Sequence, residues 1–196
     1  MPTDTYLGIS KTYSSELKAS GSKFYGFLFP VKDEVDFEEK IKEFKAQYAD
    51  ATHVCSACVI GVERDYQRFS DDGEPSNSSG RPILHALLFT EASYIACAVV
   101  RYYGGKKLGI PGLIESYGGA AQMCTEQARF ATHQLKAELL VSMDPAKSYL
   151  LYNFVARNGD IEMESTPDGK FILRFPKSMT DELQKELTKI VTLAIE

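Results

Sequence analysis

The sequence predicts an α+β protein built from two domains. Hydrophobic residues make up 44% of the 196 residues and charged residues 25%, which is typical of globular proteins. Short aromatic and β-branched runs, typical of strands, alternate with helical patterns along the chain. Near residues 132–136 a second series of strands and helices begins, which indicates a domain boundary. Because the length suits one large domain or two small ones, we expect one domain at 1–134 and a second at 135–196.

The elements expected in the first domain follow from apolar periodicity and turn residues. Asp36, with Glu39 three residues later, has the capping-box spacing that starts a helix. Residues 94–102 are a continuous apolar run, as in a strand buried on both faces. The full set comprises strands at 5–11, 23–31, 52–62 and 94–102, and helices starting after Asp36, from Pro82 to Leu88, and from about Pro111 to His133.

The second domain is expected to be ferredoxin-like. Asp144-Pro145 is a helix start signal, and Asn158-Gly159 is a helix end signal. Pro167-Asp168-Gly169 separates two apolar runs and predicts a hairpin. Ser178 with Asp181 predicts the start of another helix. With strands at 137–143, 161–166, 170–175 and 191–195, the order is β-α-β-β-α-β, the split-βαβ arrangement.

Charge and targeting features narrow the class of protein. The formal net charge of −5 excludes a globally basic nucleic-acid binder, so any such contact needs a local patch. No apolar run reaches the roughly 18 residues of a membrane helix. The first residues, Met1-Pro2-Thr3-Asp4, lack the pattern of a signal peptide. We therefore expect a soluble, cytoplasmic protein.

The four cysteines include one Cys-x-x-Cys pair, in His53-Val-Cys55-Ser-Ala-Cys58. Zinc needs four ligands, and the sequence offers no second pair. On a strand, residues three apart face opposite sides, so Cys55 and Cys58 cannot share a metal. We expect reduced cysteines packed in the core, and neither a metal nor a cofactor.

A polar loop, Phe69-Ser-Asp-Asp-Gly-Glu-Pro-Ser-Asn-Ser-Ser-Gly80, carries three carboxylates within four residues. Asp71, Asp72 and Glu74 are most simply turn and helix-capping residues, because Asp bonds nearby backbone groups. Alternatively, they form the rim of a binding site together with Ser76, or hold Mg²⁺ through water. The sequence alone leaves these three interpretations open.

A glycine-rich basic loop, Arg101-Tyr-Tyr-Gly-Gly-Lys-Lys-Leu-Gly-Ile-Pro-Gly112, separates a strand from a helix. Backbone N–H groups at a helix start, beside glycines, favour anion binding, and the donors expected here are Gly109, Ile110, Gly112 and Leu113. The loop is not a P-loop, because Ile110-Pro111 stands where Lys-Ser or Lys-Thr is required. The alternative is that the glycines only permit a tight turn. The residues expected to bind phosphate or RNA are Arg81, Arg101, Gly104, Gly105, Lys106, Lys107 and Gly109.

Three segments together resemble the YigZ/IMPACT family: FSDDGEPSNSSGRPIL, VVRYYGGKKLGIPGLIESYGGA and the terminal LAIE. The resemblance covers nearly the whole chain. It departs at Pro111, where the family usually has glycine, which removes one N–H donor from the turn. It also departs at Asn77-Ser78-Ser79, where Gly-Thr-Ala is usual.

The resemblance implies an N-terminal domain similar to the fold of GHMP kinases and of a ribosomal-protein domain. It implies a C-terminal ferredoxin-like domain similar to the last domain of elongation factor G. For function it implies a role in translation or nucleic-acid binding, since eukaryotic relatives regulate translation. Fold alone does not establish function.

Three functional hypotheses follow from these observations. The first is a non-enzymatic binding module that contacts RNA, the ribosome or a translation factor through the basic loop. The second is an enzyme that acts on a phosphorylated small molecule or nucleotide. The third is a protein-interaction module without an anion site. A steep fall of affinity with salt would separate the first hypothesis from the third.

Overall fold

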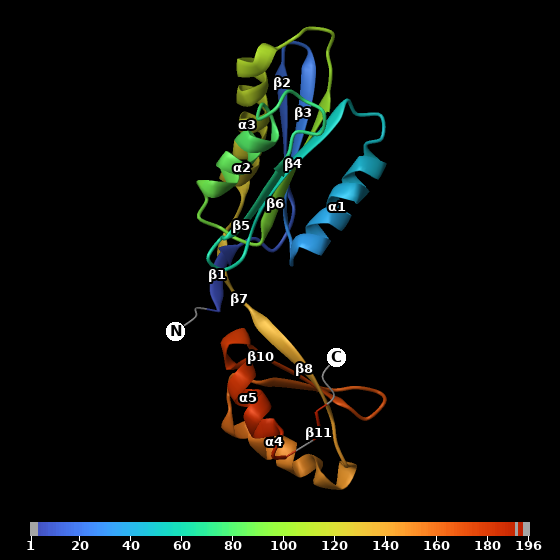
Figure 1. Cartoon of the computed structure of the whole chain (residues 1–196), viewed down its shortest axis with the longest axis vertical. Helices are drawn as coiled ribbons and strands as arrows, with labels where there is room; N and C mark the ends of the chain where they lie inside the picture. The colour runs from blue at the N-terminus through green and yellow to red at the C-terminus, as the bar shows by residue number, and fades with distance from the viewer. Residues whose placement is uncertain (1–3, 191, 194–196) are drawn as a thin grey trace. The chain divides into compact units, whose positions relative to one another are not determined.

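The computed structural model describes residues 4–190 and 192–193, and the chain divides into two compact units (Figure 1). The first unit comprises Tyr6–His133. The second unit comprises the chain from Gln134 onward together with Asp4 and Thr5, which the sequence analysis assigned to the first domain. Asp4 joins the second unit because its carbonyl accepts the N–H of Leu135 and its carboxylate accepts the N–H of Ser178, at 2.9 Å.

The first unit is built on a five-stranded sheet in which every neighbouring pair is antiparallel. The strand order is β2-β3-β6-β4-β5. The apolar run expected as a strand forms β6, the central strand, which is buried along almost its whole length. The strands are β2 (Tyr13–Ala19), β3 (Ser22–Pro30), β4 (His53–Ile60), β5 (Tyr66–Ser70) and β6 (Ile95–Tyr102).

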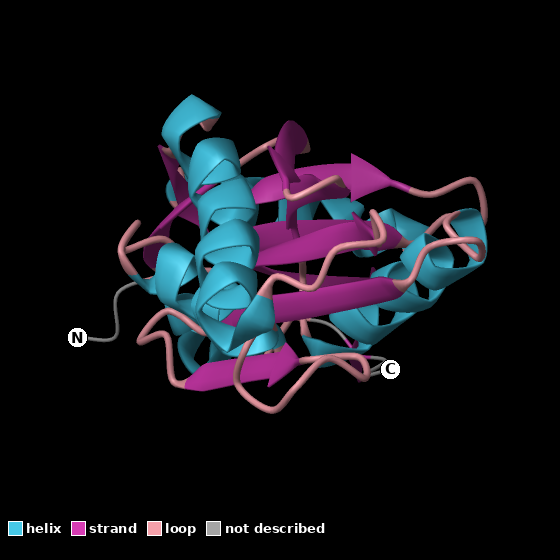
Figure 2. Ribbon diagram, turned by 90° about the horizontal axis from the view of Figure 1, so that it is seen from above, coloured by secondary structure: helices cyan, strands magenta, loops and turns pink. Residues whose placement is uncertain are grey.

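Helices cover both faces of this sheet (Figures 1 and 2). On one face lie α2 (Gly80–Leu88) and α3 (Gly109–Gln127), and on the other lies α1 (Glu34–Gln47). The two faces have separate hydrophobic cores. Cys55 belongs to the core beneath α2 and α3, and Cys58 to the core beneath α1. The predicted opposite orientation of these two cysteines is therefore confirmed.

The cap of α1 lies three residues earlier than the sequence analysis placed it. Asp33 is the N-cap, and its carboxylate accepts the N–H of Asp36 at 2.8 Å. The carboxylate of Asp36 in turn accepts the N–H of Lys32 at 2.8 Å. The first bond is that of a capping box, whereas the second joins Asp36 to the residue before the N-cap rather than to Asp33 itself. Because Asp stands at both 33 and 36, residue spacing alone selected the wrong one.

The end of α3 differs from the prediction. The helix stops at Gln127, and the residues expected to complete it form β7 (Ala131–Gln134). This strand pairs with β1 (Thr5–Gly8) in a separate two-stranded sheet. The small apolar residues continue past Gln127, so periodicity extended the helix too far. Pairing with a strand from the start of the chain decides the actual structure.

The second unit has a four-stranded antiparallel sheet in the order β11-β8-β10-β9. Its elements follow one another as strand, helix, strand, strand, helix, strand. Of the last strand predicted, 191–195, only residues 192 and 193 lie within the described part of the chain. The elements are β8 (Lys136–Ser142), α4 (Ser148–Arg157), β9 (Glu162–Ser165), β10 (Phe171–Pro176), α5 (Thr180–Leu187) and β11 (Thr192–Leu193).

Ser178 does not open α5 as the sequence analysis expected. The helix begins at Thr180 after a short 3-10 turn over Lys177–Met179, and Ser178 instead donates to Asp4. Within the described residues, no helix combines the length and the apolar character needed to cross a membrane.

Candidate anion-binding pocket

The basic loop between β6 and α3 is fixed by close backbone packing. The N–H of Gly104 donates to Ser22 Oγ at 3.2 Å. A Cβ atom on Gly104 would lie only 1.9 Å from the carbonyl carbon of Gly21, so no other residue fits there. Gly105 and Gly109 adopt positive φ angles of 84° and 69°. These glycines set the path of the loop, which agrees with the alternative that they permit a tight turn. The path of the loop determines where Lys106 and Lys107 lie.

A cavity of about 460 Å³, which we call the α3 pocket, lies beside this loop. Its walls come from three segments that are distant in sequence. Thr52 and His53 contribute the start of β4, and Glu74 and Pro75 contribute the acidic loop. The third wall is the segment 101–113, including Arg101, Tyr103, Lys107 and Gly109. The pocket thus brings together residues from both loops that the sequence analysis selected.

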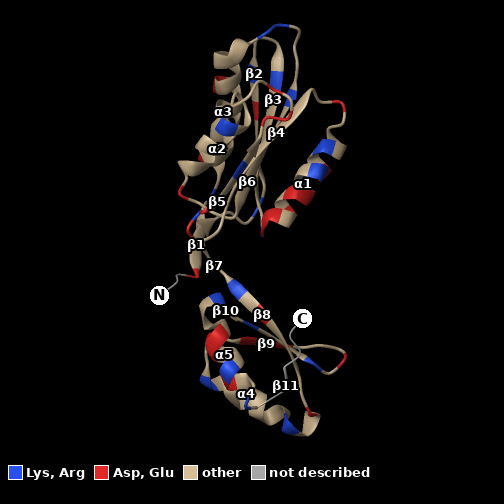
Figure 3. Ribbon diagram, viewed as in Figure 1, with Lys and Arg blue, Asp and Glu red and all other residues tan. Residues whose placement is uncertain are grey.

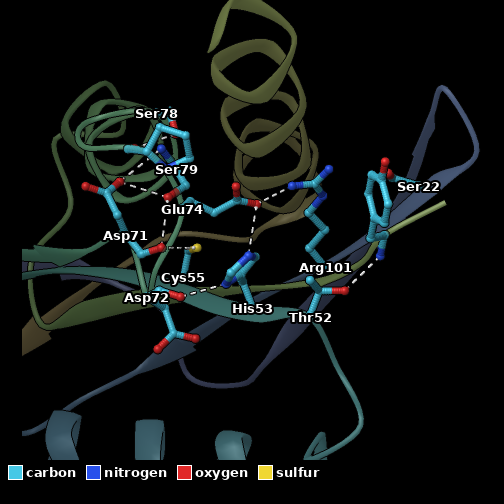
Figure 4. Close-up of polar contacts among 12 residues, drawn as sticks. Ser22, Thr52, His53, Cys55, Asp71, Asp72, Glu74, Ser78, Ser79 and Arg101 are labelled. Atoms are coloured by element: carbon cyan, nitrogen blue, oxygen red, sulfur yellow. Dashed lines mark hydrogen bonds and ion pairs between the residues drawn. The ribbon is translucent and has the colours of Figure 1, made fainter. Parts of the chain in front are cut away.

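Arg101 and Glu74 form a buried ion pair inside this pocket (Figure 4). Their side chains are only 7% and 4% exposed. Arg101 Nη1 donates to Glu74 Oε1, while Arg101 Nε is buried without a hydrogen-bond partner among the described residues. From its charge beside the glycines, Arg101 is expected to contact phosphate. The structure instead commits part of its guanidinium to Glu74.

Glu74 also connects the pocket to neighbouring elements. Its Oε1 accepts the hydroxyl of Tyr117, from α3, at 2.8 Å. His53 Nε2 lies 4.0 Å from the same oxygen, and His53 Nδ1 is 2.7 Å from the carbonyl of Asp72. Burial raises the pKa of Tyr117, so its hydroxyl remains a donor to Glu74. Glu74 is therefore the centre of a polar network rather than a residue of an exposed rim.

Asp71 caps α2. Its carboxylate accepts the N–H groups of Asn77, Ser79 and Gly80 at 2.8, 3.1 and 2.8 Å. Partial burial acts to raise the pKa of Asp71, but the hydrogen bonds from Asn77, Gly80 and Ser79 outweigh it and lower the pKa below its usual value. This is the capping role that the sequence analysis named as the simplest interpretation.

Asp72 and Ser76 have separate positions. Asp72 Oδ2 accepts the N–H of Val54 at 2.7 Å, and Oδ1 pairs with Lys45 of α1. Figure 4 shows the carboxylates of Asp71, Asp72 and Glu74 pointing in different directions. Ser76 is exposed, accepts from Asn77 Nδ2 at 3.1 Å, and does not line the α3 pocket. The four residues expected to act as one rim thus have four different environments.

Cys55 lies beneath the network. Its Sγ donates to the carbonyl of Asp71 at 3.1 Å, and burial raises its pKa to about 12. A thiol with that pKa stays protonated at neutral pH, and the thiolate is the nucleophilic form. Despite its proximity to His53 and Glu74, Cys55 therefore does not have the properties of a catalytic nucleophile.

The positive charge of the pocket comes from the loop. Lys106 and Lys107 are exposed, and within the described residues no carboxylate pairs with either. Figure 3 colours the ribbon at Lys and Arg positions blue, and such positions occur on this loop and on nearby strands of the sheet. Lys107 lines the pocket together with Arg101. Arg81 lies elsewhere, at a cavity beside α2, so the structure does not place it with the other basic residues.

The start of α3 supplies fewer donors than the sequence analysis expected. Because the helix begins at Gly109, the N–H groups of Gly112 and Leu113 fall within its internal hydrogen-bond pattern. Pro111 has no N–H. Leu108, the N-cap, has no side-chain hydrogen bond. Gly109 and Ile110 therefore remain as helical N–H donors beside Lys107.

His53 and Tyr103 also line this pocket, although their sequence motifs do not indicate it. His53 stands beside the Cys-x-x-Cys pair, and Tyr103 belongs to the basic loop. Both enter the pocket because β4 and β6 are adjacent and antiparallel, with His53 opposite Arg101. That register was the missing information, and no local motif in either segment shows it.

Comparison with known proteins identifies the family. Residues 20–125 match the Impact N-terminal domain, which is more than half of the chain. The chain belongs to the IMPACT family. The basic loop, the acidic loop and the α3 pocket all lie inside the matched region, so the site belongs to the part that this family shares.

Bacterial relatives support the assignment. The chain is 39% identical to the IMPACT family member YvyE of Bacillus subtilis over 114 residues, which is 58% of this chain and 52% of the relative. It is 42% identical to YigZ of Escherichia coli over 89 residues, which is 44% of each chain. A Thermus thermophilus member is 36% identical over 71% of this chain and 78% of its own length. The match thus spans about half the length of the first two relatives.

One solved structure shows the same fold. A crystal structure of a hypothetical protein matches with a TM-score of 0.72 and 24% identity, covering 100% of this chain and 99% of the other. The two-domain translational regulator Yih1 matches weakly, with a TM-score of 0.38 and 22% identity over 62% of this chain and 47% of its own. The first match establishes the IMPACT-like α+β fold, and the second is too weak to support an argument.

Proposed function

We propose that the first unit is a binding module that holds phosphate groups of RNA at the α3 pocket and acts in translation. The main support is that Lys107, Arg101 and the start of α3 lie around one cavity. No side chain of the described residues caps this helix start, so its N–H groups are free to bind a ligand. Two cations and free N–H donors favour an anion, and RNA presents phosphates in series. Lys106, next to the pocket, would contact an adjacent phosphate.

The buried ion pair fits this role. Glu74 neutralises part of the Arg101 charge and fixes the guanidinium, so Lys107 and the helix start supply the remaining positive potential. Arg101 Nε is buried and has no partner among the described residues, so an ordered water or an anion deep in the pocket would satisfy it.

The test is RNA binding by the Lys106→Ala, Lys107→Ala double variant. We expect weaker binding of a short single-stranded RNA, and a log–log salt slope that flattens by roughly 0.7 for each phosphate that the variant no longer binds. The melting temperature should stay nearly unchanged, because exposed lysines contribute little to folding. Binding is measured by fluorescence anisotropy at several salt concentrations.

A matched control is the Lys185→Ala, Lys189→Ala double variant, which removes the same charge from exposed positions of the second unit. It should bind RNA like the wild type. Equal RNA affinity of the wild type and the Lys106/Lys107 variant would contradict the proposal and favour the protein-interaction hypothesis. A cavity of about 660 Å³ beside α2, lined by Phe69, Leu84 and Ile114, offers an apolar surface for that alternative.

An enzyme acting on a phosphorylated small molecule is the second candidate. The volume of the α3 pocket lies within the range of roughly 300–1,000 Å³ typical of small-molecule sites, and Glu74 and His53 form its polar wall. Incubation of the protein with a panel of nucleotides and sugar phosphates tests this candidate. Turnover that is abolished in a Glu74→Gln protein shown by its unfolding transition to be still folded would favour it over the binding module.

We also propose that residues 1–134 and 135–196 are the two evolutionary domains, and that the second is ferredoxin-like. The support is the strand order β11-β8-β10-β9 combined with the split-βαβ order of elements. A similarity to the last domain of elongation factor G would agree with a role in translation.

A further inference from the structure

One end of the first unit's sheet is left uncovered by α1 and carries tyrosines. On the face that α1 covers, Tyr25 of β3 and Tyr102 of β6 lie beyond the core residues Phe29 and Ala98. Tyr25 pairs with Val100, and Tyr102 pairs with Lys23, so the two tyrosines are diagonal neighbours on adjacent strands. Their ring centroids are 6.1 Å apart, and the rings are nearly perpendicular, at 80°.

These rings line a hollow of about 520 Å³, which we call the tyrosine hollow. Four of its six lining residues are tyrosines: Tyr25, Tyr48, Tyr102 and Tyr103. Such a concentration of half-exposed aromatic rings is unusual for a surface that only contacts water. Aromatic rings at the surface of a sheet can hold unstacked bases.

The tyrosine hollow and the α3 pocket share Tyr103, whose side chain is exposed. The Arg101 guanidinium lies over the Tyr103 ring, 5.5 Å from its centroid. Arg101 lines the α3 pocket and Tyr103 lines both cavities, so the Tyr103 side chain joins the pocket to the hollow. The hollow lies on the face of the sheet that α1 covers and the α3 pocket on the face that α2 and α3 cover, so a single strand that occupies both must pass Tyr103 at the end of β6.

Charge around the hollow favours a polyanion. Lys23 lines it, Lys18 is opposite Lys23 on β2, and Lys106 and Lys107 follow Tyr103 in the loop. Nearby carboxylates offset part of this charge. Glu16 pairs with Lys18 at 3.1 Å, and Asp50, which accepts the hydroxyl of Tyr102 at 2.9 Å, keeps its negative charge. The excess positive charge therefore comes from Lys23, Lys106 and Lys107.

We propose that the tyrosine hollow stacks the bases of a single-stranded nucleic acid whose phosphates lie in the α3 pocket. The inference rests on the proposed function and makes it more specific. It assigns base stacking to Tyr25 and Tyr103, and it excludes duplex as the preferred ligand, because paired bases do not expose their faces.

The experiment uses two ligands of equal charge: a 12-nucleotide oligouridylate and a 12-unit abasic sugar–phosphate oligomer. Phosphate contacts alone would bind both equally, whereas stacking requires bases. We expect the full-length protein to bind oligouridylate at least about fivefold more tightly, the lower end of the effect of one stacked base. In Tyr25→Leu and Tyr103→Ala this preference should fall, while affinity for the abasic oligomer stays the same.

The chain contains no tryptophan, so a single Tyr→Trp substitution gives an unambiguous fluorescence probe. In Tyr103→Trp, oligouridylate should quench the tryptophan emission, and the abasic oligomer should not. The control is Tyr149→Trp, at a position that is 59% exposed in the second unit, and its emission should not change.

The outcomes separate the two proposals. Equal binding of both oligomers with a steep salt slope would overturn the stacking proposal and leave phosphate binding intact. Failure to bind either oligomer would overturn both. Tighter binding of a 12-base-pair duplex than of oligouridylate would also overturn the stacking proposal.

Discussion

Arg101 and Glu74 are 27 positions apart, and their pairing shows what a single residue does in this fold. Each was selected from its local motif, Arg101 for its charge beside glycines and Glu74 as one of three clustered carboxylates. In the structure each buries the other's charge. A buried pair of this kind need not stabilise the fold relative to apolar residues, but removing one partner leaves an uncompensated charge.

We expect Glu74→Gln to lower the free energy of unfolding by about 3–5 kcal/mol, since Arg101 would remain charged and buried. The control is Glu38→Gln, which breaks the pair with Arg68. Both side chains of this pair are exposed, by 53% for Arg68 and 40% for Glu38. That change should cost no more than about 1 kcal/mol. Urea unfolding measures both, and similarly small decreases in the two variants would show that Arg101 finds another partner.

Among the elements, the loop between β6 and α3 depends most on backbone geometry. Its position follows from the contact of Gly104 with the turn between β2 and β3 and from the hydrogen bond of the Gly104 N–H to Ser22 Oγ. The same contact holds Lys107 at the α3 pocket. A substitution that separates the loop from this turn should therefore affect both stability and anion binding.

We expect Gly104→Ala to destabilise the protein by about 1–3 kcal/mol, because its Cβ would overlap the backbone of Gly21. RNA binding should weaken in the same variant. Gly159→Ala is the control, since a Cβ there meets nothing within 4 Å. Thermal unfolding and anisotropy check the two effects. A wild-type melting temperature for Gly104→Ala would contradict the packing that we describe.

The molecule as a whole has independent cores in its two units. Phe24, Leu28 and Tyr117 belong to the core of the first unit, and Leu151 and Leu173 belong to that of the second. Each unit has its own sheet and its own helices. Compact units with separate cores can open separately.

Matched leucine truncations test this independence. Leu28 and Leu173 are both fully buried, and each Leu→Ala change should cost about 2–5 kcal/mol. We expect Leu28→Ala to reduce amide hydrogen-exchange protection in β3, β4 and β6 only, and Leu173→Ala to reduce it in β8, β9 and β10 only. Reduced protection across the whole chain in either variant would show one cooperative unit instead.

The sequence by itself determined the elements whose signals are local. The apolar run of β6 and the hairpin at Pro167-Asp168-Gly169 depend on neighbouring residues, so period and turn chemistry were sufficient. The opposite orientation of Cys55 and Cys58 follows from the two-residue repeat of a strand.

Only the tertiary structure decided the end of α3, the partner of Arg101, and the meeting of His53, Glu74 and Tyr103 in one pocket. Each depends on strand register or on contacts between distant segments. Local periodicity contains no information on which strand lies beside which, and a charged residue can equally face solvent or a buried partner. Local motifs therefore indicated Arg101 and Glu74 as candidate residues. Their roles depended on long-range pairing, because that pairing decides how much free energy it costs to bury backbone groups and charges.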